Sequence, residues 1–254
     1  MDILRYWTST DFEISSYKWH LSERKNKTYT TSGSDNSGLC TYTYNELGFR
    51  GDSINTKGFK VMSLGCSLTE GVGVNDNETW PAQFCSHIHN SVNFNFGVGG
   101  RSNDFIVRCL LSYYDLIKPD LVLIMYTYST RKEYYTQLGG VEPYIPAQSW
   151  GFLEETPEGR ATQYLKDRLQ NDNEDFINWY KNHLLITNFL ENKKTPFIWS
   201  DGILETQYKD TNKFCFDYYY PYLDSGADGM HPGPNHHKFY AKNLYDYVKE
   251  QNLI

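Results

Sequence analysis

The sequence predicts an α/β protein in which helices cover both faces of a parallel sheet. From residue 58 onward, apolar runs of strand length alternate with segments of helical periodicity. One run, residues 121–126, is almost wholly apolar, which is typical of a strand buried on both faces. Repeated strand–helix units favour parallel strands joined by right-handed crossovers. With 254 residues, the chain is long enough for one large domain with a full core.

The core elements follow in chain order. Strands are predicted at residues 59–64, 92–96, 121–126 and 195–200. Helices are predicted at residues 78–90, from 102 or 103 to 117, 174–191 and 235–250. Pro81 is tolerated in the first turn of the first helix, and Ser102 or Asn103 would cap the second.

Two parts of the chain fall outside this alternation. Residues 1–57 lack helical periodicity and carry Ser, Thr, Asn and Gly clusters, so we expect an extension with a few strands. This extension would pack on a main domain of residues 58–254. Residues from about 129 to 171 carry Gly and Pro with little periodicity. They are too long for a simple connector, which indicates an insertion with functional weight.

Composition narrows the class of protein. The net charge of -7 argues against non-specific nucleic-acid binding. No signal peptide follows the first residues, and no apolar run is long enough to span a membrane. Five cysteines form no metal spacing, and an odd number fits free thiols in a reducing compartment. We therefore expect a cytoplasmic or phage-associated protein without a membrane partner.

Residues 61–71 place a small nucleophile at the end of a predicted strand. The apolar run 61–64 breaks at Gly65, and Ser67 follows at once. In open α/β sheets, ligands bind at the edge where the carboxyl ends of the strands meet. Two further loops should reach that edge: the Gly-rich stretch 95–102, and residues 228–232, Asp-Gly-Met-His-Pro.

These loops carry the parts that acyl transfer needs. Serine requires an adjacent base, and histidine as the base requires a carboxylate to orient it. Asp228 and His231 are three residues apart, so one tight turn could hold both and present His231 to Ser67. The backbone N–H groups of Ser67 and Gly100 are candidate donors to the developing oxyanion.

Each part also has a plainer interpretation. A lone Ser after a strand is most often a helix cap, and an Asp-x-x-His spacing is common. Residues 97–100 could form a phosphate-binding turn, but they lack the third glycine and the later acidic residue of a dinucleotide fingerprint. The catalytic interpretation is favoured because all three loops occur in the order that brings them to one edge.

Other polar residues near these loops are interpreted as structural. We interpret Cys66 as buried packing at a strand end rather than as the nucleophile. His236 and His237 open the last helix, where a solvated face is favoured over a metal site. No metal and no cofactor are expected. We interpret three acidic features as charges at helix ends: Glu70, Asp76 and the run 172–175.

Taken together, these stretches resemble the SGNH (GDSL-like) hydrolase family over roughly residues 45–131 and 225–250. The matching segments are residues 45–51, similar to the opening segment of a bacterial subgroup, residues 61–73, similar to the nucleophile block, residues 95–100, similar to the second block, and residues 228–232, similar to the last block.

The resemblance implies a fold and a chemistry. The fold would be a flavodoxin-like three-layer α/β/α sandwich with a parallel sheet of about five strands. The chemistry would be hydrolysis or transfer of ester-linked acyl groups without a metal. Ser67 would be the nucleophile, Asp228 and His231 would complete the triad, and Gly100 would donate to the oxyanion.

The chain departs from the family pattern at two places. The Asp that precedes the nucleophile in the family is Cys66 here. The family's Gly-x-Asn-Asp after the third strand is also missing, and counting from the strand puts Ser129 at the position of the oxyanion-binding Asn, with Arg131 two residues on. Asn103 and Asp104 imitate the missing pair but start a helix, so we interpret them as a cap.

The expected function is therefore a serine esterase. An O-acetylated carbohydrate is the favoured substrate class, because aromatic residues, 17% of the chain, suit sugars; biased base composition of the genome would also explain their number. Aromatic residues of the insertion are candidates for substrate contact, or for a packed loop cluster: Tyr134, Tyr135, Tyr144 and Trp150. Two alternatives remain, a catalytically impaired binding or structural module and a sugar O-acyltransferase.

Overall fold

The structure is a computed structural model of the whole chain. It describes residues 24–32, 39–136, 145–148, 172–202, 210–214 and 222–254. The statements below concern these residues.

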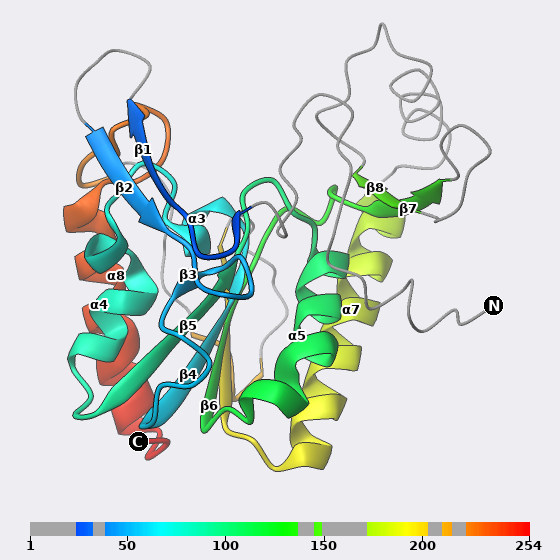
Figure 1. Cartoon of the computed structure of the whole chain (residues 1–254). Helices are drawn as coiled ribbons and strands as arrows, with labels where there is room; N and C mark the ends of the chain where they lie inside the picture. Colours follow the sequence, from blue (N-terminus) through cyan, green and yellow to red (C-terminus); the bar gives the residue numbers. More distant parts are fainter. Residues whose placement is uncertain (1–23, 33–38, 137–144, 149–171, 203–209, 215–221) are drawn as a thin grey trace, which may run out of the picture.

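One five-stranded sheet forms the centre of the molecule, in the order β3-β5-β4-β6-β9 (Figure 1). Four strands are parallel: β4 (Phe59–Gly65), β5 (Ser91–Gly97), β6 (Leu121–Tyr126) and β9 (Phe197–Asp201). Numbered along the chain, these four have the spatial order 2-1-3-4, which is the order of a flavodoxin-like sheet. The predicted fold class is therefore confirmed.

The fifth strand of the sheet does not lie beyond β9, where a further parallel strand would be expected. It is β3 (Arg50–Gly51), which pairs antiparallel with β5 at the opposite edge. Beyond β9, Lys213 makes a single parallel bridge to Trp199. The sheet thus gains an antiparallel edge strand from the N-terminal part of the chain.

Helices cover both faces of the sheet, which gives three layers (Figure 1). α4 (Trp80–Ser86) and α8 (Pro234–Glu250) pack together on one face, and α5 (Asn103–Ile117) and α7 (Asp172–Lys193) on the other. The helix predicted at 78–90 is shorter at both ends: Thr79 caps α4 after a separate 3-10 helix, η1 (Asp76–Glu78), and α4 ends at Ser86 with His87 as its C-cap.

Each face of the sheet has its own apolar core. Val122, Ile124 and Trp199 belong to the cluster under α5 and α7, while Leu123 and Ile198 belong to the cluster under α4 and α8. This alternation follows from the two-residue period of a strand that is buried on both sides.

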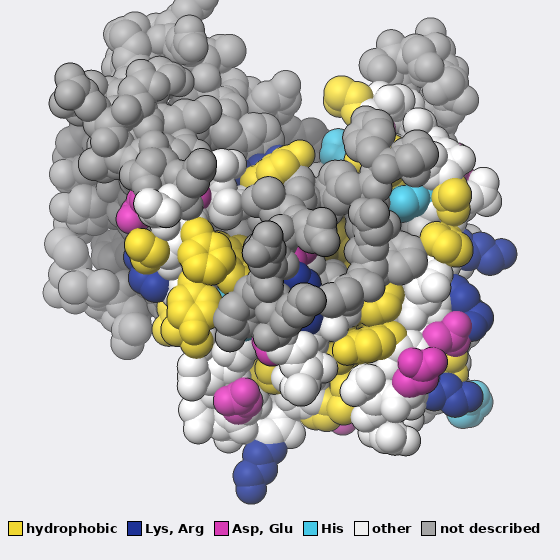
Figure 2. Space-filling model, turned by 180° about the vertical axis from the view of Figure 1, so that it is seen from behind, with side chains coloured by type: hydrophobic (Ala, Val, Ile, Leu, Met, Phe, Trp, Pro, Cys, Tyr) yellow, Lys and Arg dark blue, Asp and Glu magenta, His cyan; other side chains and the backbone are white. Residues whose placement is uncertain are grey.

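The helices leave some of their apolar side chains exposed. In α8, Leu244 and Val248 are buried, but Phe239 is exposed. α7 leaves a set of apolar side chains exposed, and Figure 2 shows hydrophobic side chains gathered on the side of the molecule where α7 lies. The set comprises Phe176, Ile177, Leu184 and Leu185.

The N-terminal part and the insertion each add a small antiparallel pair. β1 (Thr28–Ser32) pairs with β2 (Leu39–Thr43), and β7 (Glu133–Thr136) pairs with β8 (Ile145–Gln148). None of the helices in the described part of the chain combines the length and apolar character needed to cross a bilayer.

Candidate active site

Ser67 is the first residue of α3 (Ser67–Glu70), the single turn that directly follows β4. The cap position is occupied by Cys66, which makes no side-chain cap bond, so Ser67 is not the helix cap. Ser67 is largely buried, and its Oγ lies 3.9 Å from Cys66 Sγ. As the first helical residue, Ser67 has a backbone N–H without an intrahelical acceptor.

Asp228 and His231 form a hydrogen-bonded pair. His231 Nδ1 lies 2.5 Å from Asp228 Oδ2, and the backbone N–H groups of Met230 and His231 donate to Asp228 Oδ1 at 3.1 and 3.0 Å. Burial raises the pKa of Asp228, but these hydrogen bonds outweigh burial and hold the pKa at about 2. Because an ionised carboxylate only accepts, Nδ1 carries the proton, and Nε2 of the neutral ring is left as the basic nitrogen.

The loop that carries this pair contacts the turn after α3. Ala227 N–H donates to the Gly73 carbonyl at 2.8 Å. Gly73 has a φ of +88°, and a Cβ there would lie 2.9 Å from Asp228 Oδ1. The turn itself starts from Ser67, whose carbonyl accepts from Gly71 N–H at 2.9 Å. The structure thus brings the Asp228–His231 loop against the segment that begins with Ser67, although no hydrogen bond joins Ser67 Oγ to His231.

The Gly-rich loop after β5 lies beside Ser67. A Cβ placed on Gly99 would be 3.8 Å from Ser67 Cβ. The Gly99 N–H donates to Glu70 Oε2 at 2.5 Å. Gly100, next in the chain, has a φ of +77°, a conformation that favours glycine.

Glu70 makes contacts beside Ser67 that the sequence interpretation missed. It was expected to be a charge at a helix end, and it is the last residue of α3, but its side chain is also buried. Its Oε1 accepts from Arg24 Nη1 and from the Tyr44 hydroxyl, each at 3.0 Å. Both partners lie in the N-terminal part of the chain, so no local sequence signal indicated the contact.

The segment after β6 is bound by Asn103 of α5, a contact that the sequence interpretation missed. Asn103 was interpreted as part of a cap, but Ser102 is the cap of α5 and Asn103 is buried. The Asn103 amide bonds the backbone of Thr127 twice, accepting from its N–H at 2.9 Å and donating to its carbonyl at 3.1 Å. The segment that carries Ser129 and Arg131 is therefore held by its first residue.

The two side chains predicted to assist the oxyanion lie in this segment. Ser129 is half-buried and makes no hydrogen bond to a described residue. Arg131 donates from Nη1 to Thr127 Oγ1 at 3.0 Å, and its guanidinium lies 4.9 Å from the centre of the Tyr128 ring. Both of these contacts lie within its own segment.

The interpretation of two histidines needs correction. His236 and His237, expected on a solvated helix face, are both buried. The His237 Nδ1 accepts from Trp80 N–H at 3.1 Å. The acidic run 172–175 opens α7, as expected, and within it Asp175 is buried and pairs with Lys132 Nζ at 2.9 Å. Among the described residues, no group of three or more His, Cys, Asp or Glu is arranged to hold a metal ion.

The predicted substrate contacts fall in the insertion. Tyr134 and Tyr135 lie in β7, where they pair with Ala147 and Pro146 of β8. Tyr144 and Trp150 lie outside the described residues.

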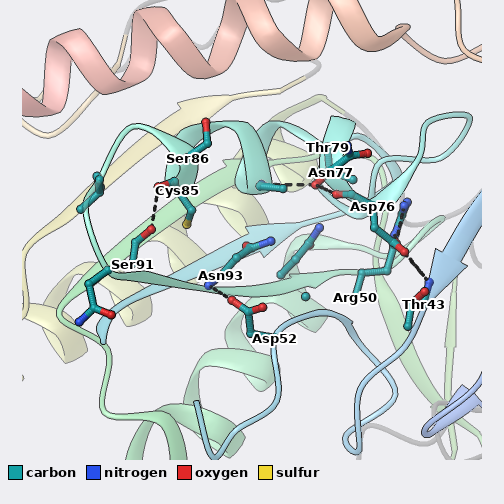
Figure 3. A pocket seen from close by; sticks show the side chains of 15 residues that line it. Thr43, Arg50, Asp52, Asp76, Asn77, Thr79, Cys85, Ser86, Ser91 and Asn93 are labelled. Carbon is teal, nitrogen blue, oxygen red and sulfur yellow. Dashed lines mark hydrogen bonds and ion pairs between the residues drawn. The ribbon is translucent and has the colours of Figure 1, made fainter. Parts of the chain in front are cut away.

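A separate pocket of about 520 Å³ lies at the antiparallel edge of the sheet, between β3, β5 and α4 (Figure 3). Most of the residues that line it have polar side chains, among them Asp52, Asp76, Asn77 and Asn93. The Asp52 carboxylate accepts from Asn93 N–H at 2.8 Å. None of the three predicted catalytic residues lines this pocket, so it is distinct from the candidate active site.

Compared with protein-family models and with curated proteins, the chain matches none. Among solved structures, it is similar to a protein assigned to the lipolytic G-D-S-L family from Desulfitobacterium hafniense DCB-2, at 15% identity and a TM-score of 0.34, covering 74% of this chain and 99% of that one. It is also similar to a protein assigned as an acylhydrolase from Bacteroides fragilis NCTC 9343, at 17% identity and a TM-score of 0.32, covering 77% and 88%.

A third similar structure is a GDSL-like lipase from Bacteroides thetaiotaomicron VPI-5482, at 14% identity and a TM-score of 0.32, covering 76% of this chain and 89% of that one. At such low identities and TM-scores, we base the fold on the strand order and the function on the geometry of the site.

Proposed function

We propose that this protein is a serine ester hydrolase with Ser67 as nucleophile, His231 as base and Asp228 as the group that orients His231. The observation that carries the proposal is the ionised Asp228 on His231 Nδ1, in a loop that contacts the turn after Ser67. This arrangement leaves Nε2 as the basic nitrogen, which is the form that a base for a serine hydroxyl requires.

The proposed reaction has two stages. In the first, Ser67 Oγ attacks the ester carbonyl, His231 Nε2 takes the hydroxyl proton, and the leaving alcohol then receives that proton as the acyl-enzyme forms. In the second, His231 takes a proton from water, which attacks the acyl-enzyme; His231 then gives that proton to Ser67 Oγ as the acid is released. Asp228 stabilises the imidazolium in both stages.

The developing oxyanion would be held by the backbone N–H groups of Ser67 and Gly100. Ser129 supplies a hydroxyl and Arg131 a cation in the place of the side-chain donor that related enzymes carry. For Arg131 to assist, its guanidinium would leave Thr127 and Tyr128. Removing one oxyanion donor typically lowers kcat about 10²–10³-fold, so the contribution of these two side chains should have a large effect on turnover.

The favoured substrate is an ester-linked acetyl group on a carbohydrate. The aromatic residues of the insertion support this class, with Tyr134, Tyr135 and Trp150 as candidate contacts. A cytoplasmic enzyme and a phage-associated enzyme would use the same chemistry. Transfer of the acyl group to a sugar, in place of water, would use the same three catalytic residues.

The test is turnover and active-site labelling. We expect the wild type to release p-nitrophenol from p-nitrophenyl acetate and to react with a fluorophosphonate probe at Ser67. Ser67→Ala should abolish both, whereas Ser86→Ala, which removes an exposed hydroxyl of α4, should leave both unchanged. Turnover that survives Ser67→Ala would refute the assignment.

A protein that folds but neither turns over ester nor labels at Ser67 would support the second candidate, a catalytically impaired binding or structural module. The departure after β6, where Ser129 stands in the place of an amide donor, favours this candidate. Analysis of products with and without added sugar acceptors separates hydrolysis from acyl transfer.

A further inference from the structure

Glu70 links three parts of the chain through one buried carboxylate. Its Oε1 accepts from Arg24 and Tyr44, each at 3.0 Å, and its Oε2 accepts from Gly99 N–H at 2.5 Å. The Arg24–Glu70 ion pair is buried, with side-chain exposures of 8% and 7%. Glu70 has no part in the proposed chemistry, so its burial at this place needs its own explanation.

The position of Glu70 relative to Ser67 is fixed. Both residues belong to the four-residue helix α3, and the Glu70 N–H donates to the Cys66 carbonyl at 2.8 Å. The Gly-rich loop contacts the same helix, because a Cβ on Gly99 would lie 3.8 Å from Ser67 Cβ and 3.0 Å from Glu70 Oε2. One short helix therefore carries both the nucleophile and the acceptor that holds the loop beside it.

We propose that Glu70 is a positioning residue that holds the Gly99–Gly100 backbone at Ser67, so that the Gly100 N–H donates to the oxyanion. The inference rests on the proposed function. Because Glu70 takes the Gly99 N–H, that group is not an oxyanion donor, and the next amide along the loop has this role. A donor that is fixed before the reaction stabilises the oxyanion without reorganising during it.

A carboxylate is the group suited to this position. All three neighbours donate, and an ionised carboxylate accepts on both oxygens without carrying a hydrogen of its own. Hydrogen bonds to a charged acceptor are also stronger than neutral ones. Burial, followed by the charge of Glu70, raises the pKa of Tyr44 well above its ordinary value, so the Tyr44 hydroxyl remains a donor throughout the working pH range.

Glu70→Gln tests the proposal with little change in shape. The glutamine amide has one acceptor oxygen and one donor NH₂ group. The NH₂ group therefore always faces another donor, either the Gly99 N–H or the Arg24 and Tyr44 groups. We expect kcat for p-nitrophenyl acetate to fall about 10²–10³-fold, as for the loss of one oxyanion donor, with KM changed less than about 3-fold. A purely structural role would lower the melting temperature without this separation of kcat from KM.

Two controls accompany the variant. Tyr44→Phe removes one bond to Oε1 and leaves the Gly99 contact, so its kcat should fall less than that of Glu70→Gln. Glu191→Gln, at an exposed position in α7, should leave kcat unchanged. If Glu70→Gln does not fold, Glu70→Asp keeps the charge but shortens the side chain, and we expect its kcat to fall by about 10-fold or more.

Amide hydrogen exchange gives a readout that is independent of activity. The Gly99 amide should be protected in the wild type and should exchange at least about 10-fold faster in Glu70→Gln. Wild-type kcat and exchange in that variant would overturn the role of Glu70 and leave the esterase assignment intact. A wild type that folds but does not label at Ser67 would overturn both.

Discussion

His237 is a buried histidine whose protonation should weaken the fold. Burial, and after it electrostatic interactions with His236, Arg50 and His231, lower its pKa from 6.5 to about 3. The unfolded chain therefore binds the proton more tightly, and stability is complete above about pH 6.5 and is lost as the pH falls toward 3. With these two pKa values, linkage gives a loss of about 2 kcal/mol between pH 7 and pH 5.

The assay is urea unfolding of the wild type and His237→Asn at pH 7 and pH 5. The asparagine oxygen occupies nearly the place of Nδ1, so it accepts the Trp80 N–H that His237 accepts at 3.1 Å. The wild type should lose about 2 kcal/mol more stability than the variant between the two pH values. His183, whose pKa burial also lowers, titrates in both proteins and cancels in the difference. His89→Gln, at an exposed site, should behave as the wild type. Equal losses in the wild type and His237→Asn would refute the reasoning.

Two further substitutions test contacts of the site and the core. Gly73→Ala should lower the rate of Ser67 labelling at least about 10-fold, because its Cβ would lie 2.9 Å from Asp228 Oδ1; Gly229→Ala has a similar φ but nothing within 4 Å of its Cβ, so it should lose less. Arg108→Met should destabilise the protein by about 3–5 kcal/mol in urea unfolding, because it leaves the buried Glu133 carboxylate without its 2.8 Å partner. Lys193→Met removes an exposed ion pair and should cost much less stability than Arg108→Met; equal losses in these two variants would contradict the importance of the buried ion pair.

The parallel core was predictable because each strand carries its signal locally. Residues 121–126 form β6 with the predicted bounds, since an apolar run of that length has few other ways to be buried. The first helix was misjudged for an equally local reason. Asn75 and Glu78 form a capping box, and Thr79 then caps α4, so two short helices replace one.

In the candidate site, too, contacts between residues close in sequence could be predicted and long-range contacts could not. Asp228 and His231 are three residues apart, so their spacing alone suggested that one turn holds both, and the structure has them hydrogen-bonded. The contacts of Asn103 and Glu70 were missed because their partners lie far away in the sequence. Asn103 bonds Thr127, 24 residues on, and Glu70 bonds Arg24, 46 residues back. A helix-terminal position explains each residue locally, and only the folded chain shows the long-range contact.

Arg50 shows how far the candidate site depends on the N-terminal part of the chain. A helix of four residues leaves its last carbonyls without intrahelical donors. Arg50 Nη1 donates to the carbonyls of Glu70 at 2.9 Å and Gly71 at 2.7 Å, and Nη2 donates to that of Val74 at 3.0 Å. A chain that began at residue 58 would lose these donors, at about 1–3 kcal/mol for each buried carbonyl left unpaired. The division of the chain at residue 57 stays a prediction, but the turn between Ser67 and Asp228 is held from the N-terminal side of that division.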